Sequence, residues 1–326
     1  MAKDVPIMRK RKKIAVVGAG IGGLVSALKL AHEGFEVKVF ERSEHPGGKI
    51  RTLEANSGPI NIGPTVLTML PIFQNLFREV GEDIFDHLEL KEQNILARHW
   101  WSDGTEFDLF TNKNNTFDEI RNVFGSNAAN QYMEFFHTTE KMFTCFEKPV
   151  MKTVSPAPIE ILKEICKTPT VIPALFPFRT LDKYLKSKFS EPKLQQLFGR
   201  YATYVGGSPL NSPALMALVW QAEAKGVWTV KGGISSVAKA IERLAEDRGV
   251  EFIYGHRVIE IQQSKHLVNK VCLDDGTNYE ADAIIFNGDP RALALGLLGE
   301  GLRKVTKNTR NTPRSLSANV WGFESK

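Results

Sequence analysis

The chain has few cysteines and no long apolar run, and these two shortages exclude several classes of protein. Only Cys145, Cys166 and Cys272 occur among the 326 residues, and no two of them have the spacing of a zinc knuckle. Their odd number and wide separation also provide no disulfide framework, so a reducing, cytoplasmic compartment is expected. No stretch of about 18 uninterrupted apolar residues is present, so a membrane-spanning helix is not expected.

Signals for metal, hydrolytic and nucleic-acid chemistry are also missing. The 7 histidines show no metal-ligand spacing and there is no G-x-S-x-G elbow, so neither a metal site nor a serine hydrolase is expected. A basic block at 9–13 contributes to the net charge of +5 and fits either a solvated tail or contact with anionic lipid or nucleic acid. No second basic cluster with interleaved aromatic residues supports a nucleic-acid partner. Residues 1–8 lack the apolar core of a signal peptide.

The strongest motif lies near the start of the chain. The apolar, β-branched run Lys13–Val17 suits a buried parallel strand, and Gly18-Ala19-Gly20-Ile21-Gly22-Gly23 follows at once in the G-x-G-x-x-G pattern. Helical spacing of apolar residues begins at Ile21, Gly34 marks a stop, and Glu36–Phe40 is expected to be a second strand. Strand, glycines, helix and strand in this order predict a dinucleotide-binding βαβ unit.

Each residue of the glycine motif has a physical role in such a unit. Gly18 permits the tight turn from strand to helix, Gly20 allows a pyrophosphate to approach the backbone, and Gly23 allows close packing of helix on strand. The helix that begins at Ile21 and Gly22 presents free N–H groups and the positive end of its dipole to the phosphates. We therefore assign all five residues to the cofactor.

An acidic residue ends the second expected strand. Glu41 lies 23 residues after Gly18, where a carboxylate accepts hydrogen bonds from ribose hydroxyl groups. A 2′-phosphate would face this carboxylate, so NADP is disfavoured and NAD or FAD remains.

The segment after Glu41 separates these two cofactors. Gly47-Gly48-Lys49, placed after a dinucleotide unit, resembles the two-dinucleotide flavoproteins of the amine oxidase and carotenoid desaturase type. The resemblance implies that Gly48 lets the chain pass close to the pyrophosphate of FAD and that basic residues, Lys49 and Arg42, lie beside it. By itself the same segment also fits an ordinary Pro-Gly-Gly turn.

A second segment resembles the part of carotenoid desaturases that runs along the flavin ring. It reads Asn61-Ile62-Gly63-Pro64-Thr65, in which Pro64 stiffens the backbone and Gly63 permits close approach to a flat ring. The resemblance therefore assigns Gly63, Pro64 and Thr65 to FAD. Family members often carry Asp where Asn61 stands, which weakens any role for a carboxylate there.

A narrower resemblance is carried by the segment 197–228, together with 102–105 and 286–290. These residues are similar to the 1-hydroxycarotenoid 3,4-desaturases, also called methoxyneurosporene dehydrogenases. The resemblance implies FAD-dependent desaturation of a hydroxylated acyclic carotenoid at its C3–C4 bond, with a quinone or oxygen as the electron acceptor. A desaturase for phytoene or another carotenoid, an amine oxidase, and an inactive chain that binds a lipid or a partner remain as alternatives.

The same resemblance suggests further site residues. The main chain near Val258 is expected to meet the adenine ring, and Asp289 is assigned either to FAD or to turn chemistry. Arg200, Tyr201 and Tyr204 are assigned either to the substrate or to packing. The sequence identifies no catalytic acid or base.

The expected architecture is α/β, with a Rossmann-like FAD-binding domain and an inserted substrate domain of antiparallel sheet and helices, as in amine oxidase-like flavoproteins. At 326 residues and 42% hydrophobic content, the chain fits about two globular domains. The FAD-binding domain is expected at 1–66 and 227–291, and the substrate domain at 67–226 and 292–326. Further elements are expected from periodicity and turn signals: a helix at 68–80, a hairpin of 95–101 with Glu106–Phe110, helices over 117–188 with a Pro-rich break at 168–178, a helix after Gly232-Gly233, a hairpin around 274–276, and strands at 251–254, 257–261, Ala283–Phe286 and 315–323.

The resembled enzymes extend beyond the end of this sequence. We therefore expect a chain that is incomplete at its C-terminus, binds FAD poorly and is inactive until the rest is supplied. A polyene substrate favours a protein at the inner face of the membrane. The segment 171–179, with Lys183, Lys186 and Lys188 after it, is either a membrane-contact element or a buried linker.

Overall fold

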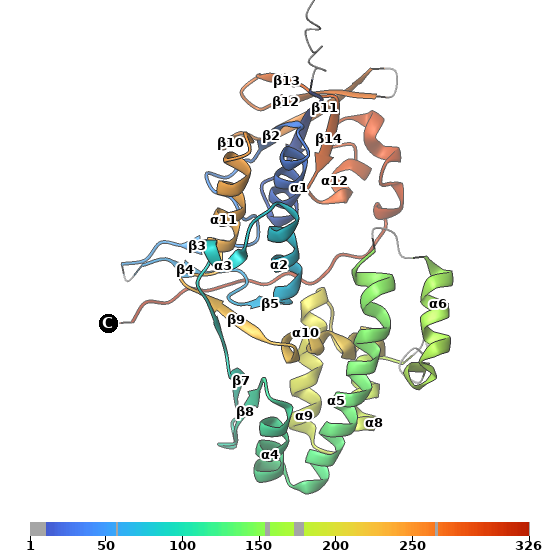
Figure 1. Cartoon of the computed structure of the whole chain (residues 1–326). Helices are drawn as coiled ribbons and strands as arrows, with labels where there is room; N and C mark the ends of the chain where they lie inside the picture. The colour runs from blue at the N-terminus through green and yellow to red at the C-terminus, as the bar shows by residue number, and fades with distance from the viewer. Residues whose placement is uncertain (1–10, 57, 154–156, 173–178, 265–266, 326) are drawn as a thin grey trace, which may run out of the picture.

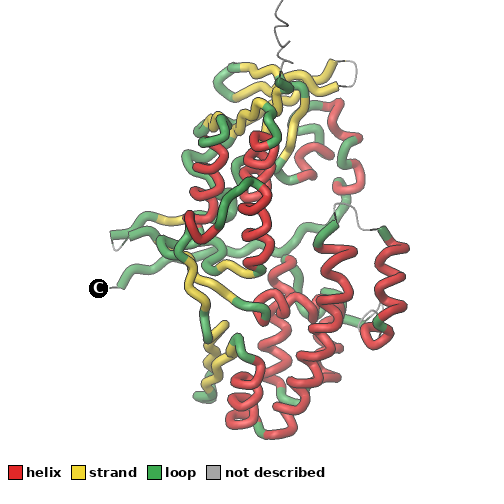
Figure 2. Tube along the Cα trace, viewed as in Figure 1, coloured by secondary structure: helices red, strands yellow, loops and turns green. Residues whose placement is uncertain are grey.

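The computed structural model describes residues 11–56, 58–153, 157–172, 179–264 and 267–325. Figure 1 shows two lobes joined by extended segments, with most of the first and last thirds of the chain in the upper lobe. Most of the middle third forms the lower lobe. In Figure 2 the strands concentrate in the upper lobe and at the junction, and the lower lobe is mostly helical.

A parallel four-stranded sheet is the centre of the upper lobe. Its order is β10 (Glu251–Ile253), β2 (Glu36–Phe40), β1 (Lys13–Val17) and β14 (Ala283–Phe286). All three strand pairs are parallel, and Val17 of β1 stands opposite both Phe40 and Phe286. The carboxyl ends of the three neighbouring strands therefore meet at one edge, as in a Rossmann-like domain.

The two faces of this sheet are covered differently. Helices α1 (Ile21–His32) and α11 (Ser235–Glu246) pack with Ile14 and Val16 of β1 in one core. The other face carries Ala15, which packs with an antiparallel meander and the segment that follows β14. These elements are β11 (Val258–Ser264), β12 (Leu267–Leu273), β13 (Asn278–Glu280), α12 (Pro290–Ala294) and the 3-10 helices η5 (Glu300–Lys304) and η6 (Lys307–Thr309).

Short strands connect the lobes. They comprise the pair β3 (Thr52–Leu53) and β4 (Ile60–Asn61), and a three-stranded sheet in the order β5 (Leu67–Thr68), β9 (Val227–Val230) and β6 (Leu90–Glu92). Helices α2 (Leu70–Glu79) and α3 (Ile84–His87) bury Leu76, Phe77 and Ile84 in the core shared with α1 and α11.

The lower lobe has its own aromatic core. Trp220 is buried among Phe135, Phe136 and Phe198, and its indole Nε1 donates to Thr139 Oγ1 at 2.8 Å. The lobe contains the hairpin β7 (Ile95–Trp100) and β8 (Glu106–Phe110), helices α4 (Lys113–Phe124), α5 (Ser126–Phe146), α6 (Pro158–Lys167), α8 (Leu181–Lys188), α9 (Pro192–Gly199) and α10 (Gln221–Ala224), the π-helical turn η1 (Glu147–Met151), and the 3-10 helices η2 (Pro169–Val171), η3 (Arg200–Val205) and η4 (Ala214–Trp220).

The structure confirms most of the expected elements, including both hairpins, β1, β2, β14 and the helical middle region. Part of the Pro-rich segment, 173–178, lies outside the described residues. The domain limits remain a prediction, although 70–88 and 293–302 pack against the two cores of the upper lobe.

The strand expected at 315–323 is wrong. This segment is extended and exposed, and crosses between the lobes without belonging to any sheet of the described residues (Figure 1). Its backbone contact with the rest of the chain is the bond from Leu316 N to Gly206 O at 2.7 Å. Alternating side chains indicate the two faces of a strand, but a strand forms only where a partner backbone lies alongside.

Candidate functional site

The glycine-rich loop joins β1 to α1 at the carboxyl edge of the parallel sheet. Gly18 has a φ of +100°, which a side chain would strain, and its N–H donates to Phe40 O at 2.8 Å. A Cβ on Gly23 would lie 2.0 Å from Gly18 O, so only glycine allows the helix to approach the strand this closely. The structure thus confirms the predicted conformational roles of both glycines.

The two middle glycines face Asn287, which follows β14. A Cβ on Gly20 would lie 2.9 Å from Asn287 Nδ2, and one on Gly22 would lie 2.7 Å from Asn287 Oδ1. The N–H of Asn287 donates to Val17 O at 2.8 Å, which fixes its backbone beside the loop. Asn287 is absent from our sequence-based site assignments. Its signals were its position immediately after an expected strand and its place in the family-like segment 286–290.

The second predicted loop packs directly on the first. Gly47 forms a parallel bridge with Gly20, and its N–H donates to Ala19 O at 2.8 Å. A Cβ on Gly48 would lie 3.0 Å from Gly20 Cα. The structure therefore brings together the segments around residues 20 and 48.

Glu41 is buried behind the glycine loop. Its Oε2 accepts a hydrogen bond from Ala19 N at 2.8 Å, and its Oε1 accepts one from Ser43 N at 2.9 Å. A carboxylate oxygen has two lone pairs, so each oxygen can accept another donor, such as a ribose hydroxyl. These two hydrogen bonds fix the position of the carboxylate and leave each of its oxygens able to accept another.

The N-terminus of helix α1 has the features of a diphosphate-binding site. Its N-cap is Gly20, no side chain caps it, and its first turn contains no acidic residue. The first N–H groups of a helix have no partner within the helix, and they carry the positive end of its dipole. Ile21 and Gly22 therefore present donors and a favourable potential to an anion. These features and the close glycine loops fit the pyrophosphate of a dinucleotide.

The segment predicted to run along the flavin ring lies between β4 and β5. Gly63, Pro64 and Thr65 are exposed, and a Cβ on Gly63 would lie 2.1 Å from Lys49 O. Gly63 is therefore required by contact with the second loop. Asn61 Oδ1 is buried and has no hydrogen-bond partner among the described residues, which leaves one acceptor for a ligand group.

The remaining predicted cofactor residues have different surroundings. Arg42 and Lys49 are exposed beside the loops, and Val258 is buried in β11. Asp289 caps α12 by accepting from Arg291 N at 3.0 Å and pairs with Arg314 at 2.5 Å. Their contacts with a cofactor remain predictions.

The bond from Arg291 N to Asp289, followed by the ion pair with Arg314, lowers the pKa of Asp289. Asp289 therefore has the turn role that the sequence suggested, as the N-cap of α12, and its carboxylate is kept charged.

The three predicted substrate-side residues lie together in the lower lobe. Arg200, Tyr201 and Tyr204 surround Glu223, which sequence analysis did not identify as a site residue. Glu223 lies in the family-like segment, but its spacing from the tyrosines gave no recognisable motif.

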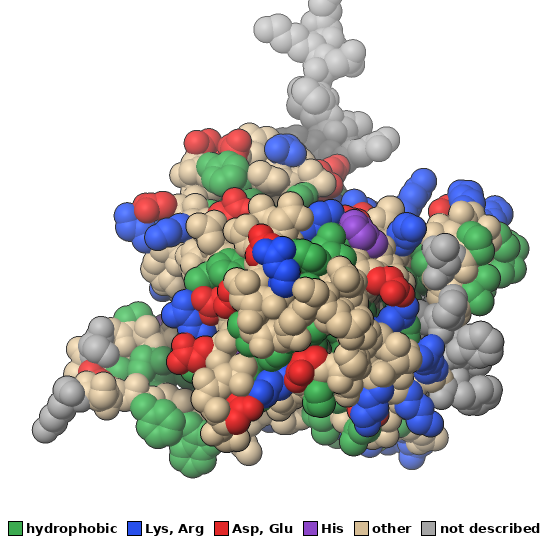
Figure 3. Space-filling model, turned by 90° about the horizontal axis from the view of Figure 1, so that it is seen from below, with side chains coloured by type: hydrophobic (Ala, Val, Ile, Leu, Met, Phe, Trp, Pro, Cys, Tyr) green, Lys and Arg blue, Asp and Glu red, His purple; other side chains and the backbone are tan. Residues whose placement is uncertain are grey.

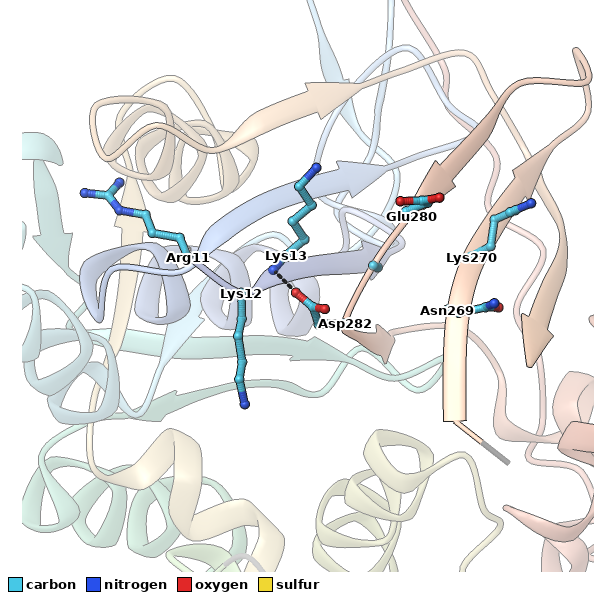
Figure 4. A pocket seen from close by; sticks show the side chains of 8 residues that line it. Arg11, Lys12, Lys13, Asn269, Lys270, Glu280 and Asp282 are labelled. Atoms are coloured by element: carbon cyan, nitrogen blue, oxygen red, sulfur yellow. Dashed lines mark hydrogen bonds between the residues drawn. The ribbon is translucent and has the colours of Figure 1, made fainter. Parts of the chain in front are cut away.

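A separate hollow lies at the amino end of the parallel sheet, away from the glycine loops. Figure 4 shows the side chains of Lys12 and Lys13 pointing in different directions, while Lys13 N donates to Asp282 Oδ2 at 2.7 Å. Its lining residues are Arg11, Lys12, Lys13, Asn269, Lys270, Glu280, Ala281 and Asp282. Because dinucleotides bind at the carboxyl ends of such strands, this hollow is not part of the cofactor site.

The described residues lack two further features. They contain no cluster of three or more histidine, cysteine, aspartate or glutamate side chains arranged to hold a metal ion. No helix within the same residues has both the length and the apolar character needed to cross a membrane.

The parallel sheet, glycine loop and buried acid define an α/β dinucleotide-binding protein with a separate helical lobe. A family model described as flavin containing amine oxidoreductase matches residues 21–320, and the chain belongs to this family. The cofactor of the protein is therefore FAD.

Among curated proteins, the chain is similar to carotenoid desaturases. The chain is 43% identical over 314 residues to hydroxyneurosporene desaturase of Cereibacter sphaeroides. The aligned region covers 96% of this chain and 63% of that protein. It is 32% identical over 323 residues to 1-hydroxycarotenoid 3,4-desaturase of a Flavobacterium species, covering 96% and 64%. The chain thus spans less than two thirds of the length of these relatives.

Solved structures confirm the fold. An oxidoreductase from Methanosarcina mazei superposes with a TM-score of 0.62 at 18% identity, covering 90% of this chain and 65% of that one. A putrescine oxidase bound to putrescine gives 0.60 at 17% identity, covering 87% and 60%. At these identities the similarity supports the amine oxidase-like fold alone.

Proposed function

We propose that this chain serves the FAD-dependent desaturation of a hydroxylated acyclic carotenoid at its C3–C4 bond. The supporting observation is its 43% identity to a hydroxyneurosporene desaturase across 96% of the chain. Identity is lower, at 30% over 281 residues, for a 4,4'-diaponeurosporene oxygenase of Staphylococcus haemolyticus. A desaturase for phytoene or another carotenoid is the closest alternative.

The reaction requires a hydride acceptor, because the saturated carbon pair of a polyene has neither an acidic proton nor an electrophilic centre. FAD, when bound, supplies that acceptor, which no side chain provides. The protein must hold the cofactor, align the carbon pair and exclude water. We assign the first task to residues 1–66 and 227–291, and the other two to 67–226 and 292–326.

The residues assigned to FAD have distinct tasks in this proposal. Gly18, Gly20 and Gly23 shape the backbone that receives the pyrophosphate, and the start of α1 neutralises its charge. Glu41 orients a ribose through its free lone pairs. Other assigned contacts are Ile21, Gly22, Arg42, Gly48 and Lys49 at the phosphates, Gly63, Pro64 and Thr65 at the ring, Val258 at the adenine, and Asp289 near the end of β14.

We also propose peripheral contact with the cytoplasmic face of a membrane, where an apolar polyene accumulates. Helix α6 buries none of its residues and leaves Ile159 and Leu162 more than half exposed. Lys163 and Lys167 lie on the same helix, and Figure 3 shows apolar and basic side chains together at the edge where α6 lies. The lysines pair with Glu160 and Glu164 of the same helix, so its exposed apolar side chains are the feature that suits a membrane interface. The electrons then pass to a quinone or to oxygen.

Anaerobic mixing of the flavin-loaded protein, completed to the length of its curated relatives, with a 1-hydroxylated acyclic carotenoid tests the reaction. We expect the absorption of oxidised flavin to bleach as the polyene absorption shifts to longer wavelength. Phytoene is the matched comparison, and faster bleaching with phytoene would identify the alternative desaturase. Flavin that stays oxidised with both compounds would refute the proposal.

Membrane contact is tested separately by flotation with vesicles of anionic phospholipid. The double substitution Ile159→Ser and Leu162→Ser should reduce co-flotation severalfold, because it removes the exposed apolar groups of α6. Exposed Leu267, far from α6, offers a control as Leu267→Ser. Equal loss in the control and the double variant would contradict a specific role for α6.

A further inference from the structure

A polar cluster centred on the buried side chain of Glu223 interrupts the apolar packing of the lower lobe. Tyr201 is also buried, whereas the side chain of Arg200 is 33% exposed and Tyr204 is 55% exposed. The carboxylate of Glu223 is only 5% exposed and accepts hydrogen bonds from Tyr201 Oη at 2.5 Å, Arg200 Nη2 at 3.0 Å and the hydroxyl group of Tyr204. The guanidinium of Arg200 also stacks over the ring of Tyr201, 4.7 Å from its centroid. We call these four residues the Glu223 cluster.

Stability alone is a weak explanation for this cluster. Removing a carboxylate from water costs several kcal/mol, the partial burial of the Arg200 guanidinium adds to that cost, and well-packed apolar residues often replace such pairs without loss. The neighbouring core, with Phe198 and Trp220, consists of such residues. The buried carboxylate of Glu223 therefore indicates a role that requires polarity.

Two nitrogen atoms of this region are buried and lack a hydrogen-bond partner within the described residues. They are Nε of Arg200 and Nδ1 of His99. His99 comes from β7, about a hundred residues earlier in the chain, yet its ring stacks on that of Trp101, 5.8 Å between centroids, and Trp101 Nε1 donates to Gln196 Oε1 at 2.8 Å, four residues before Arg200. Both Arg200 and Glu223 act electrostatically on His99. Burial, and then the charge of Arg200, lowers the pKa of His99, so its imidazole is neutral at physiological pH.

The two nitrogens are complementary to an alcohol. The guanidinium Nε–H of Arg200 can only donate, whereas a neutral imidazole offers one nitrogen that accepts and one that donates. A hydroxyl group accepts one hydrogen bond and donates another. A carbonyl group would satisfy Arg200 without using the acceptor of His99, and a plain hydrocarbon end would satisfy neither.

The cluster also lies close in sequence to the strands that join the lobes. Helix α10, which carries Glu223, leads into β9, where Val227 and Trp228 pair with Thr68 and Leu67. Those partners directly follow the segment assigned to the flavin ring. A site here is therefore connected through a short stretch of backbone to the place where the carbon pair must be aligned.

We propose that the Glu223 cluster and His99 form the subsite that receives the terminal hydroxyl group of the polyene. This inference rests on the proposed function and adds the residues that select the substrate. An unsubstituted polyene can slide along an apolar passage, because its repeating units look alike. The hydroxyl-bearing carbon is two bonds from C3, so an anchored hydroxyl group fixes which bond is desaturated.

Binding affinity tests the subsite without requiring turnover. The flavin-loaded protein is titrated with 1-hydroxyneurosporene and with neurosporene, which lacks the hydroxyl group, and quenching of tryptophan fluorescence gives each Kd. We expect the wild-type protein to prefer the hydroxylated polyene by about tenfold or more, the size of one or two net hydrogen bonds. His99→Phe and Arg200→Lys should each lose most of this preference while their Kd for neurosporene changes less than twofold.

A matched control comes from the same lobe. Tyr184 Oη is also buried without a partner in the described residues, but no interaction links Tyr184 to the cluster. Tyr184→Phe should retain the full preference. His99→Asn, which restores a polar side chain, should recover part of it. Thermal unfolding of each variant identifies any that fail to fold, and Arg200→Lys preserves a cation beside Glu223 if His99→Phe does not fold.

The outcomes separate this inference from the proposed function. A wild-type protein that desaturates the carotenoid but binds both polyenes equally would overturn the subsite alone. A preference that survives in both His99→Phe and Arg200→Lys would also overturn it. Selective binding that these variants abolish, in a protein that never bleaches its flavin, would support the subsite and refute the reaction.

Discussion

Glu41 shows how one carboxylate can serve both the fold and the ligand. Its two oxygens accept from the N–H groups of Ala19 and Ser43. Glu41→Ala would leave both donors unpaired, one of them fully buried, and should lower the free energy of unfolding by about 1–3 kcal/mol. Glu41→Gln keeps one acceptor oxygen and should lose less.

Urea denaturation of the flavin-free protein measures this effect, and flavin fluorescence measures the accompanying loss of FAD affinity. An unchanged stability of Glu41→Ala would contradict the structural role, whatever happens to FAD.

The glycines of the loop should differ in their tolerance of a methyl group. A Cβ at Gly23 meets the backbone oxygen of Gly18 at 2.0 Å, whereas a Cβ at Gly20 meets the side-chain end of Asn287 at 2.9 Å. Backbone cannot move aside as a side chain can, so Gly23→Ala should cost about 3 kcal/mol or more. Gly20→Ala should cost about 1 kcal/mol.

Chemical denaturation compares the two glycine variants. In an Asn287→Ala background, Gly20→Ala should cost less than in the wild-type background, while Gly23→Ala should cost the same. Equal costs for both glycines would show that contact with Gly18 does not determine the difference.

At this scale the sequence predicted backbone conformations better than contacts. The motif correctly assigned Gly18 to a turn and Gly23 to close packing, because both roles depend on residues within the motif. It could not reveal that Asn287 faces Gly20, since that contact joins positions 267 residues apart through the sheet. Glu223 and His99 were missed for the same reason.

Among the elements, one hydroxyl group of α5 accepts donors from both η4 and α10. Thr139 Oγ1 accepts from Trp220 Nε1 at 2.8 Å and from Gln221 Nε2 at 3.0 Å, and all three side chains are buried. Thr139→Val preserves the shape of the side chain but leaves Trp220 Nε1 unpaired, while Gln221 Nε2 keeps its bond to Phe136 O at 3.3 Å. It should lower the free energy of unfolding by about 1–3 kcal/mol.

Thr139→Ser is the matched control, because it keeps the hydroxyl group and removes one methyl group, at a cost of about 1 kcal/mol. Equilibrium unfolding compares the two variants. A serine variant less stable than the valine variant would show that packing, and not the hydrogen bonds, dominates at this position.

The carboxylate of Glu82 stabilises the turn between α2 and α3. Glu82 accepts from Arg248 at 2.9 Å and contacts His87 Nε2 at 3.1 Å. The bonds to Arg248 and then to His87 lower the pKa of Glu82 below its ordinary value of 4.5. A lowered pKa adds stability above the unfolded value and loses it as the pH falls through the folded value.

Thermal unfolding from pH 6 to pH 3 tests this assignment. We expect Glu82→Gln to be less stable than the wild-type protein near neutral pH, and the gap to narrow as the pH falls below 4.5. Glu79→Gln, on the neighbouring helix, provides a control. A gap that stays constant over this range would contradict a titrating contact.

Elements that depend on local signals were predicted well. The β7–β8 hairpin follows from its turn residues, and α11 from the spacing of Val237, Ile241 and Leu244. The segment 315–323 was predicted wrongly as a strand, because its alternating pattern does not show whether another backbone lies beside it.

For the molecule as a whole, the order of elements predicted the fold class more securely than the domain limits. A βαβ unit at the start and a strand ahead of Asn287 indicate a discontinuous parallel sheet, which β14 completes. Helices α2 and α3 nevertheless join the core of the upper lobe, although the expected domain limits placed residues 67–226 in the substrate domain. An amphipathic helix shows that one face is buried but not which neighbour buries it.

The position of β14 has a consequence for biosynthesis. Strand β1 pairs with β2 as soon as residue 40 is available, but its other edge waits for residue 286. At 5–20 residues per second, a ribosome needs roughly 12–50 s to make the intervening 246 residues. A nascent chain therefore exposes an open apolar strand edge during this interval, and chaperones that bind such strands are expected to occupy it until synthesis reaches β14.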